Sequence, residues 1–348
     1  MEVAFGRTAL CLIGLGVLCG ATEFTARTVD PQARHARGSL VPHHLLRPDE
    51  RYGFTTEPGA VGVSVATGRE VTYRINGAGL RDEPVPLAPT PGIHRIVLLG
   101  GDAAFGAGVA LDDHFSVAVE RDLEQVEIAN LAVPGFSPGQ MLLRLRAEGL
   151  ALAPDLVLAF VDELPGEGTT GGPLARRERP RFEAAPEGVV LAHAPQPGSG
   201  AFARLGGRIE RWLERHSSAY HVIGDALRGV HAGGHSRSFS PAAGRAPSPT
   251  PSPRALALAE ALVLAMRDEA AAAGTSFLLV TRDDALHAAA HARGVTSLDV
   301  TELLANPMFQ LPGTGGRIDA RGNRALACTL TAFLRESGLI APQHWRAL

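Results

Sequence analysis

Apolar and polar residues follow one another along this chain in the order typical of strands that alternate with helices. Near-continuous apolar runs at 94–100 and 156–161 predict buried strands, since strands of a parallel sheet are covered on both faces. Further strands are predicted at 126–133, 276–281 and 295–300. Helical spacing predicts helices at 110–123, 137–150, 253–273, 284–293 and 323–337. This alternation predicts an α/β fold, a doubly wound three-layer α/β/α sandwich around a parallel sheet.

Two shorter segments before this domain alternate in the manner of half-buried strands. They lie at 61–65 and 70–76, and the residues between them indicate a hairpin turn in which Gly68 can take a positive φ. We therefore predict a small β-rich extension at 31–92, packed on the edge of a main domain at 93–340.

The main domain carries a predicted insertion at 163–252. Its first part is rich in Gly, Pro and charge, with a short hairpin predicted near 188–191, and a helix is predicted at 201–229. The stretch at 236–254 is dominated by Ser and Pro, a composition that cannot offset its ordering entropy, so we expect a disordered loop there.

The N-terminal segment at 1–30 has the pattern of a signal peptide or signal anchor. Arg7 precedes an apolar run at 9–21, and about 15 apolar residues suit a signal core better than a membrane span, which needs about 20. Cys19 is followed by Gly20 and Ala21, which offers a cleavage site; the alternatives are a lipidated Cys19 and a buried helix. The chain is thus expected to be exported, and membrane-anchored, periplasmic or extracellular.

Composition narrows the function classes only modestly. The chain has 348 residues with a net charge of −3 and no lysine, so nothing in its charge favours nucleic acid. Three cysteines do not make a disulfide framework, and Cys328 is expected to be a small core residue. No phosphate-binding loop follows Gly100-Gly101-Asp102, and we expect no cofactor and no metal.

Three blocks of the chain share a recognisable frame. The first holds Asp102, Phe105, Gly106 and Gly108 after the strand at 94–100. The others are Asn130-Leu131-Ala132-Val133-Pro134-Gly135-Phe136-Ser137-Pro138-Gly139-Gln140 and Arg317-Ile318-Asp319-Ala320-Arg321-Gly322-Asn323. Together with the lead-in Asn76-Gly77-Ala78-Gly79-Leu80-Arg81-Asp82, this frame resembles the bacterial, N-terminally anchored SGNH or GDSL hydrolases. The resemblance implies a flavodoxin-like SGNH fold and ester hydrolysis by a Ser, an Asp-x-x-His pair and an oxyanion hole.

The positions that would do this chemistry depart from the resembled family. The nucleophile position is Ala103, and the oxyanion glycine position is Ala132. The oxyanion asparagine position falls on Asp162, whose carboxylate would repel an oxyanion. The Asp and His of the pair fall on Thr314 and Arg317. Because all of these change while the frame survives, the sequence predicts a non-catalytic descendant.

Other residues could in principle supply chemistry. Ser137 follows the second strand, but with Pro138 it more readily begins a helix as its N-cap. Asp102 could act as a base, although an Asp in such a turn more often binds backbone N–H groups. Among the histidines, His287 and His291 have i, i+4 spacing on a predicted helix without an accompanying acidic motif, which favours a solvated face. Two further histidines to consider are His231 and His235.

Three function classes remain open. The first is a non-catalytic domain that binds a glycan, an acyl group or a partner protein through Asp102, Ala103, Ser137, Asp162 and Arg317, with Arg317 pairing with Asp162 or with an anionic ligand. The second is an active esterase or acetyl hydrolase of the cell envelope that uses rearranged residues, and the third is a structural envelope component. The sequence does not indicate an oligomeric state.

Overall fold

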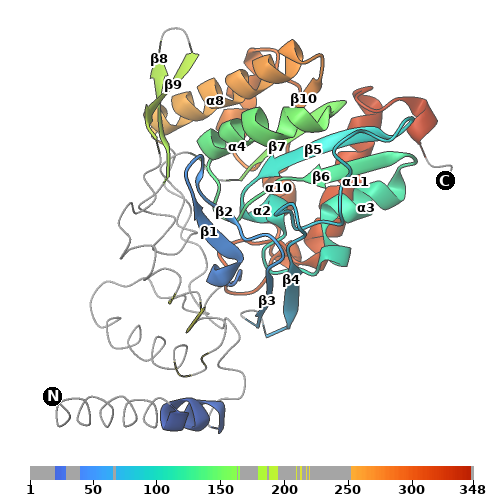
Figure 1. Cartoon of the computed structure of the whole chain (residues 1–348). Helices are drawn as coiled ribbons and strands as arrows, with labels where there is room; N and C mark the ends of the chain where they lie inside the picture. Colours follow the sequence, from blue (N-terminus) through green and yellow to red (C-terminus); the bar gives the residue numbers. More distant parts are fainter. Residues whose placement is uncertain are drawn as a thin grey trace.

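The centre of the structure is a parallel sheet (Figure 1). The computed structural model describes residues 20–28, 40–65, 68–162, 164, 179–185, 188–194, 209, 212, 213, 217, 219 and 252–345. Within them, the sheet is built from β5 (His94–Gly100), β6 (Val126–Asn130), β7 (Leu156–Val161), β10 (Ser276–Thr281) and β11 (Ser297–Asp299). The strand order is β11-β10-β7-β5-β6, and every neighbouring pair is parallel.

This strand order is that of a flavodoxin-like sheet. Numbered along the chain within the sheet, the five strands stand in the order 2-1-3-4-5. The topology reverses between β5 and β7, and such a switch point is where open α/β sheets place their ligands, outside the carboxyl ends of the strands. The predicted doubly wound α/β fold is therefore confirmed.

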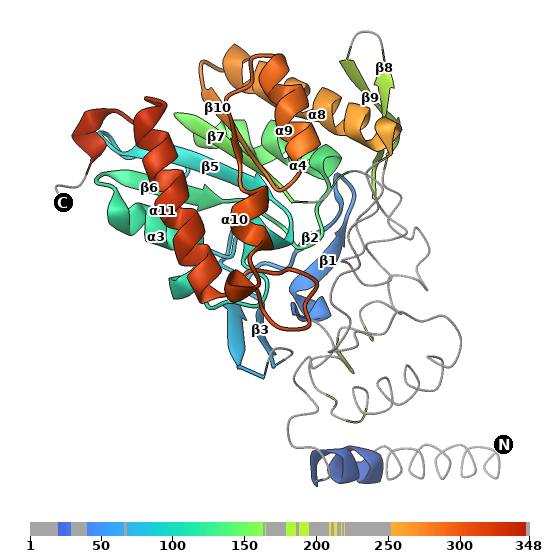
Figure 2. The same cartoon turned by 180° about the vertical axis from the view of Figure 1, so that it is seen from behind.

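Helices cover both faces of the sheet (Figures 1 and 2). One face packs against α3 (Phe115–Asp122), α10 (Thr301–Ala305) and α11 (Ala320–Glu336), and the other against α4 (Pro138–Arg144), α8 (Pro253–Ala272) and α9 (Asp284–Ala292). The side chains of β5 alternate between the two cores: Ile96 and Leu98 join the first, Val97 and Leu99 the second. The near-continuous apolar run of β5 thus has a direct structural reason.

Several helices begin or end away from their predicted bounds, each for a local reason. The segment predicted at 110–123 divides into a 3-10 turn, Leu111–Asp113, and α3, because His114 is the N-cap of α3. The segment predicted at 137–150 continues beyond α4 as a π-helical turn, Leu145–Gly149, and a 3-10 turn, Leu150–Leu152. The last helix, α11, begins three residues early, since the Asp319 carboxylate accepts a hydrogen bond from Gly322 N at 2.8 Å.

Cys328 is not a core residue, contrary to expectation. It lies on the exposed side of α11, whereas the buried face of that helix is formed by Leu326, Ala327, Leu330 and Leu334. A helix with a single apolar stripe buries only positions three or four residues apart, and position 328 falls outside that stripe.

In its described residues, the N-terminal extension contains two antiparallel hairpins. The predicted pair forms as β3 (Val61–Ser64) and β4 (Val71–Arg74), and Gly68 has the expected positive φ of 73°. A second hairpin, β1 (Leu46–Asp49) with β2 (Gly53–Thr56), was not predicted. Four-residue strands give too few alternations for a periodic signal.

The predicted hairpin of the insertion is present as β8 (Arg181–Ala185) and β9 (Gly188–His193). Its Phe182 packs directly on Gly139 of α4, where a Cβ atom would lie 2.5 Å from the ring. Most of the predicted signal or anchor segment at 1–30, of the predicted disordered loop at 236–254 and of the predicted helix at 201–229 lies outside the described residues. The last residues of that loop are ordered instead, because α8 begins at Pro253. Among the helices that are described, none is both long and apolar enough to cross a membrane.

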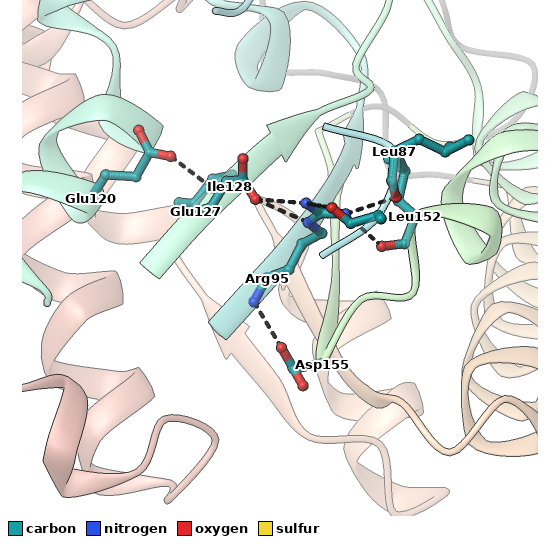
Figure 3. Close-up of polar contacts among 8 residues, drawn as sticks. Leu87, Arg95, Glu120, Glu127, Ile128, Leu152 and Asp155 are labelled. Atoms are coloured by element: carbon teal, nitrogen blue, oxygen red, sulfur yellow. Dashed lines mark hydrogen bonds and ion pairs between the residues drawn. The ribbon is translucent and has the colours of Figure 1, made fainter. Parts of the chain in front are cut away.

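The amino-terminal edge of the sheet is closed by a buried arginine (Figure 3). The Arg95 guanidinium pairs with Glu127 of β6 at 3.0 Å and donates to the carbonyls of Leu87 and Leu152. The Arg95 backbone N–H donates to Asp155, just before β7, at 2.8 Å. These contacts join three strands at the end of the sheet opposite to the switch point, so we regard this cluster as structural.

Candidate functional site

The segment that resembles a hydrolase nucleophile turn lies at the carboxyl end of β5. The strand ends at Gly100, and a single helical turn, α2 (Asp102–Phe105), follows Gly101 and closes on Gly106, whose φ is 79°. Gly101 has no space for a side chain, since a Cβ atom there would lie 3.1 Å from both Asp162 Oδ1 and the Phe136 carbonyl. The turn therefore brings Ala103 close to the end of β7.

Ala103 presents a methyl group where the resemblance implies a nucleophile. Its backbone N–H, which would be one donor of the implied oxyanion hole, donates to Asp162 Oδ2 at 3.1 Å. The second implied donor, Ala132 N–H, donates to Asn130 Oδ1 at 3.0 Å. Both backbone donors are thus directed at acceptors within the protein itself.

Three charged side chains from separate parts of the chain meet beside Ala103. Arg317, from the loop before α11, forms an ion pair with Asp102 through Nη2 and lies 3.5 Å from Asp162 Oδ2 through Nη1. Asp102 also accepts a hydrogen bond from Gly135 N at 2.8 Å. All three residues are nearly buried, and we call this group the Asp–Arg–Asp cluster. The sequence had suggested the pair Arg317–Asp162; the structure adds Asp102.

The electrostatics of the cluster are set mainly by burial. Desolvation raises the pKa of Asp162, and the Arg317 cation opposes this by favouring the ionised carboxylate. Asp102 adds to the rise because a second negative charge lies close by. Arg317 thus offers one positive charge to two neighbouring buried carboxylates.

The loop that delivers Arg317 is held by contacts that sequence reasoning did not identify. Arg282, just after β10, donates from Nη1 to the Gly316 carbonyl at 2.9 Å, and its charge also favours the ionised form of Asp162. Thr314, the other position compared with the hydrolase Asp-His pair, donates its hydroxyl to the Leu311 carbonyl at 2.7 Å. Thr314 therefore shapes this loop, and its hydroxyl is directed at the loop's own backbone.

A second buried arginine, Arg81, binds the backbone carbonyls at the end of α2. Arg81 donates to the carbonyls of Phe105 at 2.8 Å and of Gly106 and Val109 at 2.6 Å, and its guanidinium lies over the Tyr73 ring at 4.4 Å. Burial lowers the pKa of Arg81 to about 10, so it is still a cation at neutral pH. The lead-in segment at 76–82 was noted as a family resemblance, but nothing local in the sequence shows that its arginine caps this turn.

His114 contacts the Ala103 carbonyl, and both of its ring nitrogens have hydrogen-bond partners. Its Nδ1 accepts from Ser116 N–H at 3.3 Å, which assigns Nε2 as the donor to the Ala103 carbonyl at 3.3 Å. Burial, and after it the Arg81 cation, lower the pKa of His114 to about 3, so the ring is neutral at physiological pH. His114 serves as the N-cap of α3, and its ring also binds the Ala103 carbonyl of α2.

Among the remaining candidates, Ser137 has a structural role. Ser137 is the N-cap of α4 in a capping box with Gln140, whose side-chain oxygen accepts from Ser137 N at 3.0 Å. The rings of His287 and His291 stack 5.9 Å apart on α9. Within the described ranges, no group of three His, Cys, Asp or Glu side chains is arranged to hold a metal ion. His231 and His235 lie outside those ranges.

The chain has structural neighbours among solved proteins. No protein-family model matches this chain, and no curated protein matches it. Solved structures that are similar include a lipase/acylhydrolase from Enterococcus faecalis, with 13% identity, coverage of 70% of this chain and 97% of that chain, and a TM-score of 0.38. TesA has 13% identity, coverage of 71% and 99%, and a TM-score of 0.40. A GDSL-like lipase from Bacteroides thetaiotaomicron has 11% identity, coverage of 72% and 91%, and a TM-score of 0.37. Overlays at this level carry no argument about activity, and the fold rests on the strand order of the sheet.

The fold and the site together define a class of protein. The chain is a doubly wound α/β protein of flavodoxin-like topology with a nearly buried Asp–Arg–Asp cluster at its switch point. This cluster stands where open α/β sheets usually bind ligands.

Proposed function

We propose that this chain is an SGNH/GDSL-like domain without ester hydrolase activity, whose former catalytic centre is replaced by the Asp–Arg–Asp cluster. The observation that supports this most strongly is the hydrogen bond from Ala103 N to Asp162 Oδ2. Residue 103 has no nucleophilic side chain, and its backbone N–H, an implied oxyanion donor, is already bound to Asp162.

The chemistry of ester cleavage needs groups that this centre replaces. A serine mechanism requires a hydroxyl, a base that takes its proton, and donors that face the developing oxyanion. Ala103 has no hydroxyl, and Arg317, in the position compared with the base, stays protonated and offers only donors. The Asp162 carboxylate would repel the negative charge that develops on the substrate. Each of these changes alone would lower the rate of hydrolysis severely.

We further propose that the domain is exported, either tethered to a membrane or released, and that it binds a glycan, an acyl group or a partner protein. The apolar run at 9–21 after Arg7 supports export. The position of the cluster at the switch point supports a binding role for the same region.

An ester hydrolysis assay tests the loss of activity. The full chain is compared with Ala103→Ser/Asp162→Asn/Thr314→Asp/Arg317→His on p-nitrophenyl acetate, with Asp162→Asn as the background variant. We expect wild type and Asp162→Asn to hydrolyse the ester no faster than buffer alone does. The quadruple variant is expected to gain turnover. Hydrolysis by the wild type above the buffer rate would contradict the proposal. If Ser137→Ala then abolished that hydrolysis, the alternative of a rearranged esterase would be favoured.

A further inference from the structure

The Asp162 carboxylate lies among donors that could bind any carboxylate. One of its oxygens, Oδ2, accepts from Ala103 N–H at 3.1 Å and lies 3.5 Å from Arg317 Nη1. The other, Oδ1, lies beside Gly101, 3.1 Å from where a Cβ atom would stand. The Ala103 N–H, the Arg317 guanidinium and the space beside Gly101 together surround a carboxylate, and we call these groups the receptor.

The receptor is filled by the Asp162 side chain and lies close to the protein surface. The side chains of Arg317 and Asp102 keep 10% and 8% of their surface exposed, and the side chain of Asp162 keeps 3%. The Arg317 side chain thus reaches the surface slightly more than the carboxylate that it contacts. A small ligand would need to displace only the Asp162 side chain, with no change in the strands.

The charge balance makes this displacement reasonable. Arg317 contacts both Asp102 and Asp162, and Arg282 adds positive charge near Asp162. If the Asp162 carboxylate leaves or is removed, Arg317 stays paired with Asp102 while the Ala103 N–H loses the carboxylate oxygen that accepts from it. A buried N–H without its acceptor, beside a guanidinium, favours the entry of a new anion.

We infer that Ala103 N–H and Arg317 form a binding site for the carboxylate group of a ligand, and that Asp162 is its built-in occupant. The inference names a ligand class for the proposed non-catalytic site and in that respect rests on the proposed function. In wild type, Asp162 competes with the ligand, so the affinity is low until that side chain moves aside.

The test is chemical rescue of Asp162→Gly in the full chain. Thermal unfolding is followed with sodium formate or sodium chloride at equal ionic strength. Ligand binding to the folded state raises the melting temperature, and a tenfold excess over Kd is expected to raise that of Asp162→Gly by about 3 °C. Wild type is expected to shift much less. Formate that stabilises Asp162→Gly no more than chloride does would overturn the inference.

Two controls separate this site from general anion effects. Glu260→Ala removes the carboxylate partner of Arg293, an arginine that is 62% exposed, and no formate-specific shift is expected there. Asp162→Gly/Arg317→Met removes the proposed cation and is expected to lose the shift. An equal formate shift in either control would also overturn the inference. If Asp162→Gly is recovered unfolded, formate is expected to raise its refolding yield above that in chloride, and an unchanged yield counts against the site.

Related acids distinguish the sources of the carboxylate. Acetate, butyrate and glucuronate replace formate in the same assay, and a preference for butyrate or for glucuronate indicates an acyl or an acidic sugar ligand. The ester hydrolysis assay is independent of this result. Formate rescue together with wild-type hydrolysis would refute only the proposed function, whereas no rescue and no hydrolysis would refute only the carboxylate site.

Discussion

The carboxylate of Asp162 accepts a hydrogen bond from the backbone N–H of Ala103 at 3.1 Å, and this contact joins the carboxyl ends of β7 and β5. These strands flank the switch point of the sheet, where α/β proteins commonly place a ligand. Here a side chain of the protein stands there instead, held by Arg317. The main consequence is that the Asp–Arg–Asp cluster is expected to contribute to the stability of the folded state.

Arg317 is therefore expected to matter for stability. Arg317→Met leaves Asp102 and Asp162 buried together without their shared cation, and breaking a buried ion pair in this way costs about 3–5 kcal/mol. Urea unfolding of the full chain measures the change. Arg293→Met, at an exposed ion pair, is the matched control and is expected to cost about 1 kcal/mol or less. Equal losses for the two variants would show that the cluster adds no stability.

Two glycines of similar backbone conformation offer a sharper comparison. Gly106 has φ +79° and Gly59 has φ +72°, so alanine is strained at both, by about 1–2 kcal/mol. A Cβ atom at Gly106 would also lie 2.7 Å from Arg81 Nη1 and from His114 Cδ2, whereas nothing lies within 4 Å of one at Gly59. We expect Gly106→Ala to cost about 3 kcal/mol or more in unfolding free energy and Gly59→Ala only the backbone term. Similar costs would mean that Arg81 and His114 do not pack tightly around the turn.

Glu120 is expected to make stability depend on pH. Burial raises its pKa from 4.5 to about 7, so the folded state holds its proton more tightly than the unfolded state. Its contribution is therefore present in full below about pH 4.5 and is lost as the pH rises to about 7. The difference between a pKa of 4.5 and one of about 7 corresponds to about 3 kcal/mol for Glu120.

Glu120→Gln tests this dependence, since glutamine keeps the oxygen that accepts from Ile128 N at 2.7 Å. Unfolding free energies are measured between pH 4.5 and pH 7 for both proteins, and the variant is expected to lose less stability over that range. A residual slope of the same sign is expected from Asp82, whose pKa burial raises to about 6. Parallel curves for the two proteins would contradict the assignment to Glu120.

The sequence predicts the sheet well because its signal is local. The run at 276–281 is the observed β10, and the run at 156–161 is β7, since buried parallel strands are marked by their own apolar residues. The hairpin β1–β2 was missed because its short strands carry little periodicity, and Cys328 was misplaced because the stripe of α11 runs past it.

The site is predicted only in part, because its partners are distant in the chain. The positions Ala103 and Arg317 follow from the resembled blocks, and Asp162 follows from its place just after the predicted strand at 156–161. The structure brings all three together. The parts that were missed are side chains that bond to backbone carbonyls far away in the sequence. Arg81 on the α2 turn and Arg282 on Gly316 are such cases, and no local pattern specifies which carbonyls an arginine will reach.

The most direct test of the central claim is labelling of the full chain with a fluorophosphonate, which forms a covalent adduct with activated serines, followed by intact-mass measurement. If Ala103 and the Asp–Arg–Asp cluster occupy the centre, the mass of wild type stays unchanged after labelling. The quadruple variant, which carries Ala103→Ser, is expected to gain one adduct. A wild-type adduct, on Ser137 or on another serine, would contradict the account and establish an active nucleophile in this protein.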